Sequence, residues 1–211
     1  MEESAEAAPP DLVAVVDDDP GVREVIQELL PSVGLRVEAF GSAQEFMAKM
    51  DPGSTSCLVL DVRLPGKNGL DFHDELRRAD IPVPVVFISG YGDIPMTVRA
   101  MKGGAVEFLP KPFGHQELLD AVQRGVEQDR QRRDRQRRIE VLRARTVRLT
   151  SREREVMAQV VRGLRNKEIG SMLGISEVTV KAHRRQVMLK MGATTLVDLV
   201  RMTTRLRESD R

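Results

Sequence analysis

Acidic side chains follow two short apolar runs at the point where each run ends. Asp17, Asp18 and Asp19 come directly after the run LVAVV, and Asp61 comes directly after CLVL. Carboxylates that lie close together repel one another, which raises the pKa of at least one of them. A divalent cation removes this repulsion, and Mg²⁺, with Mn²⁺ as the alternative, prefers hard oxygen ligands. The acids therefore predict a magnesium site, provided that the fold brings the two runs together.

A hydroxyl and a lysine follow two further apolar runs. Ser89 comes after VPVVFI, and Lys111 comes after AVEFLP. A cation-bound carboxylate beside these groups is suited to phosphoryl transfer, because the metal and Lys111 would neutralise the phosphoryl oxygens while Asp61 attacks phosphorus. Taken singly, an aspartate at the end of a strand is most often a turn or capping residue. The combination of positions is what favours a site.

The elements that must position these residues are indicated by the hydrophobic pattern. Five short, nearly continuous apolar runs are typical of strands buried on both faces. They lie at residues 12–16, 35–40, 57–60, 83–88 and 105–109. Segments of helical periodicity lie between them, and a fifth, GHQELLDAVQRGV, follows the last run. The alternation predicts an α/β domain with a doubly wound, flavodoxin-like sheet in the order 2-1-3-4-5, which places the first and third strands side by side.

The charge is divided unequally along this chain of 211 residues. Residues 1–110 hold 9 Lys/Arg against 19 Asp/Glu, a net charge of −10, whereas residues 111–211 hold 24 against 13, a net charge of +11. The basic half is a candidate for binding a polyanion. No apolar run reaches the roughly 18 residues that span a membrane. The single cysteine allows no disulfide framework, and the acidic N-terminus does not resemble a signal peptide, so we expect a cytoplasmic protein.

Residues 123–148 change the composition again. They contain ten arginines, four acids and no proline. Opposite charges spaced four positions apart, such as Asp129 with Arg133 and Asp134 with Arg138, support a helix. Because the middle of the segment has no apolar face, we expect an extended helix that links two domains. A flexible, solvated tether is the alternative.

The rest of the sequence carries the signals of four short helices. Thr150 and Glu153 form a capping box at the start of the first. Asn166 is expected to cap the second helix and Ser176 the third, which Gly192 ends. Short helices joined by glycine-containing turns ahead of a basic helix are typical of a helix-turn-helix unit. We therefore expect an all-α second domain.

The third of these helices has two different faces at about 100° per residue. Val180, Val187 and Met191 share the face that we expect to pack on the preceding helices. The other side is suited to a DNA major groove, where Lys or Arg reads guanine and small apolar groups meet thymine methyls. The predicted base-reading residues are Val178, Lys181, Ala182 and Arg185. The predicted phosphate contacts, which position a protein without specifying a sequence, are Thr179, Arg184 and Lys190. A merely solvated basic face is the competing interpretation.

In combination, these motifs resemble a known family, the two-component response regulators. The receiver domain of that family is similar to VVDDDPGVRE, LVLDVRLPGKNG and VFISGYGDIPMTVRAMKGGAVEFLPKPF. The LuxR-type DNA-binding domain of its FixJ/NarL branch, FixJ subfamily, is similar to LTSREREVMAQVVRGLRNKEIGSMLGISEVTVKAHRRQVMLKMG. The resemblance covers nearly the whole chain. It implies a phosphorylation-dependent transcriptional regulator whose phosphate comes from a histidine kinase.

The resemblance also implies roles for matching positions at the acidic site. Asp61 matches the phospho-acceptor. Asp17 and Asp18 match the acidic pair that holds Mg²⁺ together with Asp61 and the backbone carbonyl of Arg63. Lys111 matches the lysine that contacts the phosphoryl group. The same resemblance supports Lys181, Ala182 and Arg185 as base contacts.

The resemblance further implies how phosphorylation is passed on. Ser89 and Phe108 match the switch residues that reorient, after which the surface from Asp93 to Phe108 would favour a homodimer. Two DNA-binding domains would then engage paired half-sites of double-stranded promoter DNA, with RNA polymerase as a further partner. The Lys111–Pro112 bond is expected to be cis on the resemblance alone, because only about 5–6% of such bonds are cis in folded proteins.

These expectations divide the chain into four segments. They are an N-terminal tail at 1–10, a receiver at 11–122, a helical linker at 123–146 and a helix-turn-helix domain at 147–211.

Three other functions stay open beside this one. A phosphohydrolase with an aspartyl nucleophile commonly has a second aspartate two positions later, where this chain has Arg63, so we do not expect an enzyme. A flavin or nucleotide module would need a loop that accepts phosphate after the first strand, and that loop is acidic here. An RNA-binding antiterminator is the third alternative, and competition between duplex DNA and RNA would decide it.

Overall fold

The computed structural model describes residues 11–90 and 93–209 of the chain. The tail expected at residues 1–10 lies outside the described residues. The chain forms two compact units, one up to Arg132 and one from Arg133. Each of them has a hydrophobic core. Among the described residues, no helix combines the length and the apolar character needed to cross a membrane.

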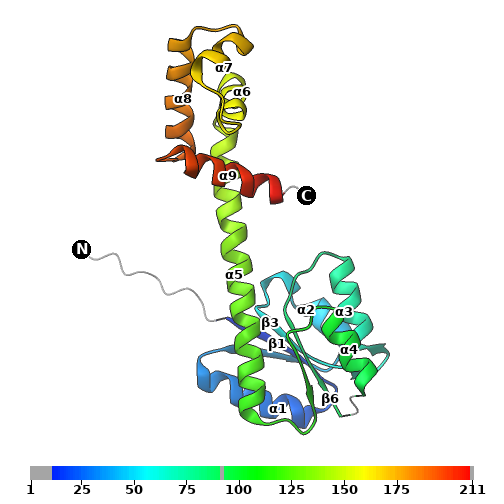
Figure 1. Ribbon diagram of the computed structural model, residues 1–211. Coiled ribbons are helices and arrows are strands. Elements are labelled where there is room, and N and C mark those ends of the chain that lie inside the picture. Colours follow the sequence, from blue (N-terminus) through cyan, green and yellow to red (C-terminus); the bar gives the residue numbers. More distant parts are fainter. Residues whose placement is uncertain (1–10, 91–92, 210–211) are drawn as a thin grey trace, which may run out of the picture. The chain divides into compact units, whose positions relative to one another are not determined.

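The first unit is built on a five-stranded parallel sheet in the order β2-β1-β3-β6-β7 (Figure 1). Its strands are β1 (Leu12–Val16), β2 (Arg36–Phe40), β3 (Cys57–Asp61), β6 (Val85–Ser89) and β7 (Glu107–Pro110). An antiparallel hairpin of β4 (Arg63–Leu64) and β5 (Lys67–Asn68), which the sequence pattern did not indicate, follows β3. With this hairpin left out, the order is the predicted 2-1-3-4-5. Val16 pairs with Leu60, so the first and third strands are neighbours as expected.

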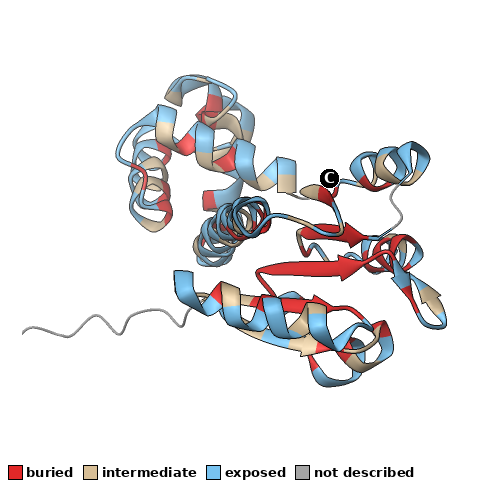
Figure 2. Cartoon of the chain, turned by 90° about the horizontal axis from the view of Figure 1, so that it is seen from below, coloured by how far each residue is buried: buried red, intermediate tan, exposed pale blue. Residues whose placement is uncertain are grey.

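Helices cover both faces of this sheet. One face packs on α1 (Pro20–Leu29) and the start of α5 (His115–Val147). The other face packs on α2 (Ala43–Lys49), α3 (Gly69–Arg78) and α4 (Ile94–Lys102). Short 3₁₀ turns lie at Leu30–Val33 and Pro52–Ser54. The three central strands, β1, β3 and β6, are almost wholly buried (Figure 2), because successive side chains point to opposite cores.

Helix α5 is continuous from His115 to Val147, so the last helix of the first unit and the expected linker are one element. Its middle is tied to the sheet. Asp129 is fully buried, and Arg130 pairs at 2.5 Å with Asp11, the residue before β1. The first unit therefore continues beyond residue 122. The ion pairs along the helix include two at spacing i,i+3, Arg132 with Asp129 and Arg137 with Asp134.

The second unit contains the four expected helices after α5. They are α6 (Ser151–Val160), α7 (Asn166–Leu173), α8 (Glu177–Met191) and α9 (Leu196–Ser209). The capping box is confirmed, since Thr150 N donates to Glu153 and Glu153 N donates to Thr150 Oγ1. Ser176 caps α8, and Gly192 ends it with a φ of 66°.

The expected cap of α7 was wrong. Asn166 is the first residue inside the helix, and Arg165 occupies the capping position. The orphan backbone N–H of Arg165 donates to the side chain of Glu168 at 2.7 Å. Asn166 instead accepts a hydrogen bond from Arg184 of α8 at 2.8 Å. A residue type that is common at caps was used for a contact between two helices.

Candidate functional site

The acids predicted to share a site do lie together at the carboxyl edge of the sheet. Asp17 follows β1 and Asp61 ends β3, and these strands are hydrogen-bonded neighbours. Asp17, Asp18 and Asp61 each offer one carboxylate oxygen, and these oxygens lie within 4.8 Å of one another. Asp17 and Asp61 are buried and Asp18 is exposed. The cluster is therefore open to solvent on the side of Asp18.

Lys111, the residue after the edge strand β7, reaches into this cluster. Its Nζ donates to Asp17 Oδ2 at 2.5 Å and to Asp61 Oδ2 at 3.1 Å. Its backbone N–H donates to the carbonyl oxygen of Ser89 at 2.7 Å, which ties it to β6. The Lys111–Pro112 bond is cis, as the resemblance led us to expect.

The electrostatics of the cluster follow from burial and from these contacts. Burial raises the pKa of Asp17 above its ordinary value, although the hydrogen bond from Lys111 opposes the shift. Burial alone would lower the pKa of Lys111, but the hydrogen bond and charge of Asp17 and the charge of Asp61 raise it. Three carboxylates and one ammonium carry two excess negative charges when all are ionised. A divalent cation would cancel them, so the oxygen donors and their charge fit Mg²⁺.

Two further residues hold the acidic segment, and the sequence reasoning missed one of them. Arg23 of α1 donates through Nη1 to the carbonyl oxygens of Asp17 at 2.6 Å and Asp18 at 3.0 Å. Asp19 caps α1, accepting from Gly21 N at 2.8 Å, and its own N–H donates to Asp17 Oδ1. Asp19 is therefore occupied as a cap. A single arginine six positions after Asp17 forms no sequence pattern that would indicate this role.

A glycine brings the start of α3 against the phospho-acceptor candidate. A Cβ on Gly69 would lie closer to the carbonyl oxygen of Asp61 than real Cβ atoms ever do. The backbone N–H of Gly69 also donates to Val62 O at 2.8 Å. Asp61 Oδ1 accepts from the backbone N–H of Arg63 at 3.2 Å. The N–H of Arg63 thus holds one oxygen of the Asp61 carboxylate, while Gly69 lies against the backbone of Asp61.

The two switch candidates are buried. Ser89, at the end of β6, is fully buried, and Phe108 is 9% exposed within β7. The ring of Phe108 lies 6.4 Å from that of Phe87. The carbonyl oxygen of Ser89 accepts from the backbone N–H of Lys111, and β6 is the neighbour of β3, so Ser89 adjoins the acidic cluster. Phe108 lies one strand further away, in β7.

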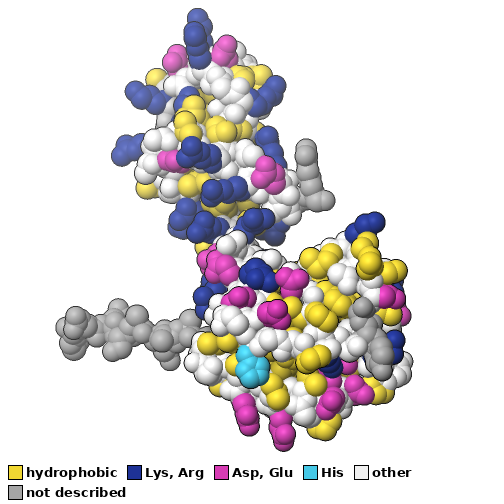
Figure 3. All heavy atoms as spheres, turned by 60° about the horizontal axis from the view of Figure 1, so that its bottom comes forward, with side chains coloured by type: hydrophobic (Ala, Val, Ile, Leu, Met, Phe, Trp, Pro, Cys, Tyr) yellow, Lys and Arg dark blue, Asp and Glu magenta, His cyan; other side chains and the backbone are white. Residues whose placement is uncertain are grey.

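The predicted packing face of α8 is confirmed. Val180, Val187 and Met191 are buried in the hydrophobic core of the second unit. The five exposed residues among the predicted DNA contacts are Val178, Thr179, Lys181, Ala182 and Arg185. Within the described chain, no side-chain partner binds Lys181 or Arg185. On the visible face of the second unit, Lys and Arg side chains are prominent (Figure 3).

Two of the predicted phosphate contacts are already engaged inside the unit. Arg184 donates to Asn166, as described above. Lys190 Nζ donates to both carboxylate oxygens of Glu153, at 2.9 and 2.7 Å. Glu153 is 5% exposed, and the hydrogen bond from Lys190 lowers its pKa. A phosphate would have to share these side chains with their internal partners.

The chain matches two protein-family models. Residues 13–123 match the response regulator receiver domain, and residues 147–203 match the bacterial regulatory proteins of the luxR family. Nodulation protein W of Bradyrhizobium diazoefficiens is 53% identical over 95% of this chain and 88% of that protein. Transcriptional regulatory protein FixJ of the same species is 36% identical over 92% of this chain and 94% of that protein.

Solved structures give the same picture. The response regulator StyR is similar with a TM-score of 0.83 and 45% identity, covering 93% of this chain and 99% of that chain. Full-length FixJ from B. japonicum has a TM-score of 0.55 and 35% identity, covering 94% and 98%. Both likenesses extend over the sheet-containing unit and the helical unit.

Proposed function

Because this chain belongs to the response regulators, with a receiver domain followed by a LuxR-type DNA-binding domain, it is a transcriptional regulator of a two-component system, and we propose that Asp61 is its phospho-acceptor. The contact that carries this proposal is the bridge from Lys111 Nζ to Asp17 and Asp61. This bridge holds the ammonium group of Lys111 where the oxygens of a transferred phosphoryl group would develop negative charge.

The reaction follows from this geometry. A carboxylate oxygen of Asp61 forms a bond to phosphorus, and the nitrogen–phosphorus bond of a phosphohistidine on the kinase breaks, leaving its electron pair on the imidazole. Lys111 neutralises the arriving oxygens, and the N–H of Arg63 orients the attacking carboxylate. The receiver domain implies the histidine kinase as the partner, and acetyl phosphate can replace it in a test.

We assign the cation to Mg²⁺, with Mn²⁺ as a substitute, held by Asp17, Asp18, Asp61 and the backbone carbonyl of Arg63. The donors are all oxygens, and the exposed Asp18 leaves room for water ligands. When bound, the cation shields the charge of the acids and of the incoming phosphoryl group. Asp17 must lose its proton before it can take part, so its raised pKa makes loading sensitive to acid.

The signal then leaves the site through Ser89 and Phe108, and dimerisation follows. Helix α4 supports this step because Ile94, Val98 and Met101, spaced at helical intervals, are 81%, 44% and 44% exposed. They lie within the surface from Asp93 to Phe108 that the sequence indicated. We propose that this surface forms a homodimer when Asp61 carries phosphate.

The second unit reads double-stranded promoter DNA through α8. We assign base contacts to Val178, Lys181, Ala182 and Arg185, and phosphate contacts to Thr179, Arg184 and Lys190. The free cations of Lys181 and Arg185 support the first group. A chain that meets a kinase and DNA, with RNA polymerase as a further partner at the promoter, acts in the cytoplasm. Neither a phosphohydrolase nor an RNA-binding protein is favoured by any residue of these two sites.

The test of the proposal is Asp61→Asn. This variant should keep the fold and lose phosphoryl uptake from acetyl phosphate, because an amide is not a nucleophile here. Intact-protein mass gives the readout. Asp19→Asn is the matched control, since asparagine caps helices as well as aspartate and uptake should persist. Phosphate on the Asp61→Asn variant, or a wild-type phosphate that resists hydroxylamine, would contradict the assignment. Steady turnover of a phosphomonoester would instead favour an enzyme.

A further inference from the structure

The end of the long helix α5 holds the end of the reading helix α8. Arg145, in the last turn of α5, donates through Nη1 to the carbonyl oxygen of Met191, the last residue of α8, at 2.8 Å. Both residues belong to the second unit, which begins at Arg133. The contact joins residues 46 positions apart in the sequence.

The chemistry of this contact suits a helix end. The last carbonyl groups of a helix have no partner within it, and the helix dipole leaves partial negative charge there. A guanidinium satisfies both. Gly192 leaves the space for it, since a Cβ at that position would lie 2.9 Å from Arg145 Nη1. The φ of 66° at Gly192 separately favours glycine. Gly192 therefore ends α8 and also leaves room for the side chain of Arg145.

Neighbouring contacts fix the same turn. Thr146 Oγ1 lies 3.8 Å from Met191 Sδ, and Leu142 and Leu149, on either side of Arg145, are buried. From α6, Glu153 binds Lys190. The last turn of α8 therefore makes contacts with both α5 and α6.

We propose that Arg145 is a positioning residue for DNA reading: it sets the tilt of α8 in the groove, an inference that rests on the proposed role of α8 as the reader. Lys181 lies ten residues before Met191, which is about 15 Å along a helix. A tilt of only a few degrees at the capped end moves the reading side chains by about 1 Å over that length. Paired hydrogen bonds to a base edge do not tolerate this, whereas flexible side chains on phosphates do.

A consequence concerns where the DNA-binding unit begins. The sequence placed its start at residue 147, and the matching family model starts there too. That boundary separates Arg145 from the helix whose end it caps. The final turns of α5 are thus a working part of the reader and not only a spacer.

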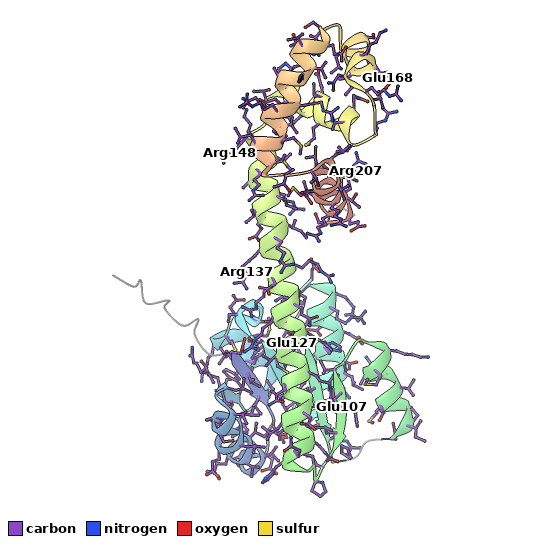
Figure 4. The ribbon with its side chains drawn as sticks, turned by 60° about the vertical axis from the view of Figure 1, so that its left-hand side comes forward. Glu107, Glu127, Arg137, Arg148, Glu168 and Arg207 are labelled. Carbon is purple, nitrogen blue, oxygen red and sulfur yellow. The ribbon has the colours of Figure 1, made fainter. Side chains whose placement is uncertain are left out.

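The experiment compares full-length variants on two duplexes. The first duplex is selected from a random library by the wild-type protein, and the second is its scrambled version. Arg145→Ala should lower the ratio of selected to scrambled affinity by about fivefold, as expected for one lost hydrogen bond. Arg145→Lys keeps a cation at the helix end and should lose less. The matched control is Arg148→Ala, which removes an exposed arginine just past α5 and should keep the ratio (Figure 4).

Each outcome decides the matter. Equal weakening on both duplexes, with a salt slope lower by about one, would make Arg145 a phosphate contact and overturn the proposal. So would an unchanged ratio at temperatures where thermal melting shows both Arg145 variants folded. Lys181→Ala is measured alongside. If it keeps the wild-type base preference, α8 is not the reader and the proposed function itself fails. If it loses that preference while Arg145→Ala does not, only the positioning role fails.

Discussion

The two charged regions of this protein hold their charges in opposite ways. At the edge of the sheet, Asp17, Asp61 and Lys111 face one another across 2.5–3.1 Å and are largely withdrawn from water. On α8, Lys181 and Arg185 are exposed, and no described side chain pairs with them. A site that forms a covalent bond must orient its groups before the substrate arrives. A surface that reads DNA keeps its groups free, because their partners are on the nucleic acid.

Gly69→Ala should give the largest effect and should confine it to the first region. The added Cβ collides with the backbone of Asp61, so the free energy of unfolding should fall by about 2–3 kcal/mol and phosphorylation should slow sharply. Urea denaturation and uptake from acetyl phosphate measure the two effects. Gly90→Ala is the control, since nothing lies within 4 Å of a Cβ there. A variant as stable and reactive as the wild type would show that the edge of the sheet is not rigidly positioned.

Lys190→Met should give an intermediate effect. Lys190 lies on α8, but its ammonium pairs with a buried carboxylate, as Lys111 does at the edge of the sheet. Its loss leaves the buried Glu153 carboxylate without a cation, and we expect a cost of about 1–2 kcal/mol, reduced because the lysine is 27% exposed. Thermal and urea melting measure it, with the exposed Lys167→Met as the control. An unchanged stability would show that the pair with Glu153 does not stabilise the fold and that Lys190 is free to contact phosphate.

The same pair has a defined pH dependence. Since its partner lowers the pKa of Glu153 in the folded protein, the stabilisation is present above the ordinary pKa of a glutamate. It is lost as the pH falls through the lowered value. The difference in stability between wild type and Lys190→Met should therefore be full near neutrality and shrink in acid.

The smallest expected effect is the response of cation binding to mild acid. Burial raises the pKa of Asp17, so a proton competes with Mg²⁺ at a higher pH than it would on an ordinary aspartate. Affinity should fall as pH falls through the raised pKa of Asp17, and calorimetry at constant ionic strength measures it. Asp17→Asn should bind more weakly and with less dependence on pH. A cation affinity that is equal at all these pH values would separate Asp17 from the metal.

Much of the architecture could be predicted because its signals are local. Continuous β-branched runs alternating with helical periods predicted five parallel strands, and the strand order then brought Asp17 and Asp61 to one edge. The capping box at Thr150 and the helix end at Gly192 are likewise written within a few residues. The packing face of α8 followed from its periodicity alone. Motif resemblance added the cis bond before Pro112.

What only the tertiary structure decided are contacts between residues far apart in the chain. Asn166 has the residue type of a cap, yet its side chain binds Arg184, 18 positions later. Lys190 was predicted to contact phosphate, and its side chain also pairs with Glu153. Arg145, which no sequence pattern singled out, caps α8. Gly69 and Arg23 help to position the acidic site, and no sequence pattern predicts these roles. Sequence periodicity indicates which face of an element is apolar. The partner of a polar side chain depends on how whole elements pack, and the hydrophobic core of each unit determines that packing.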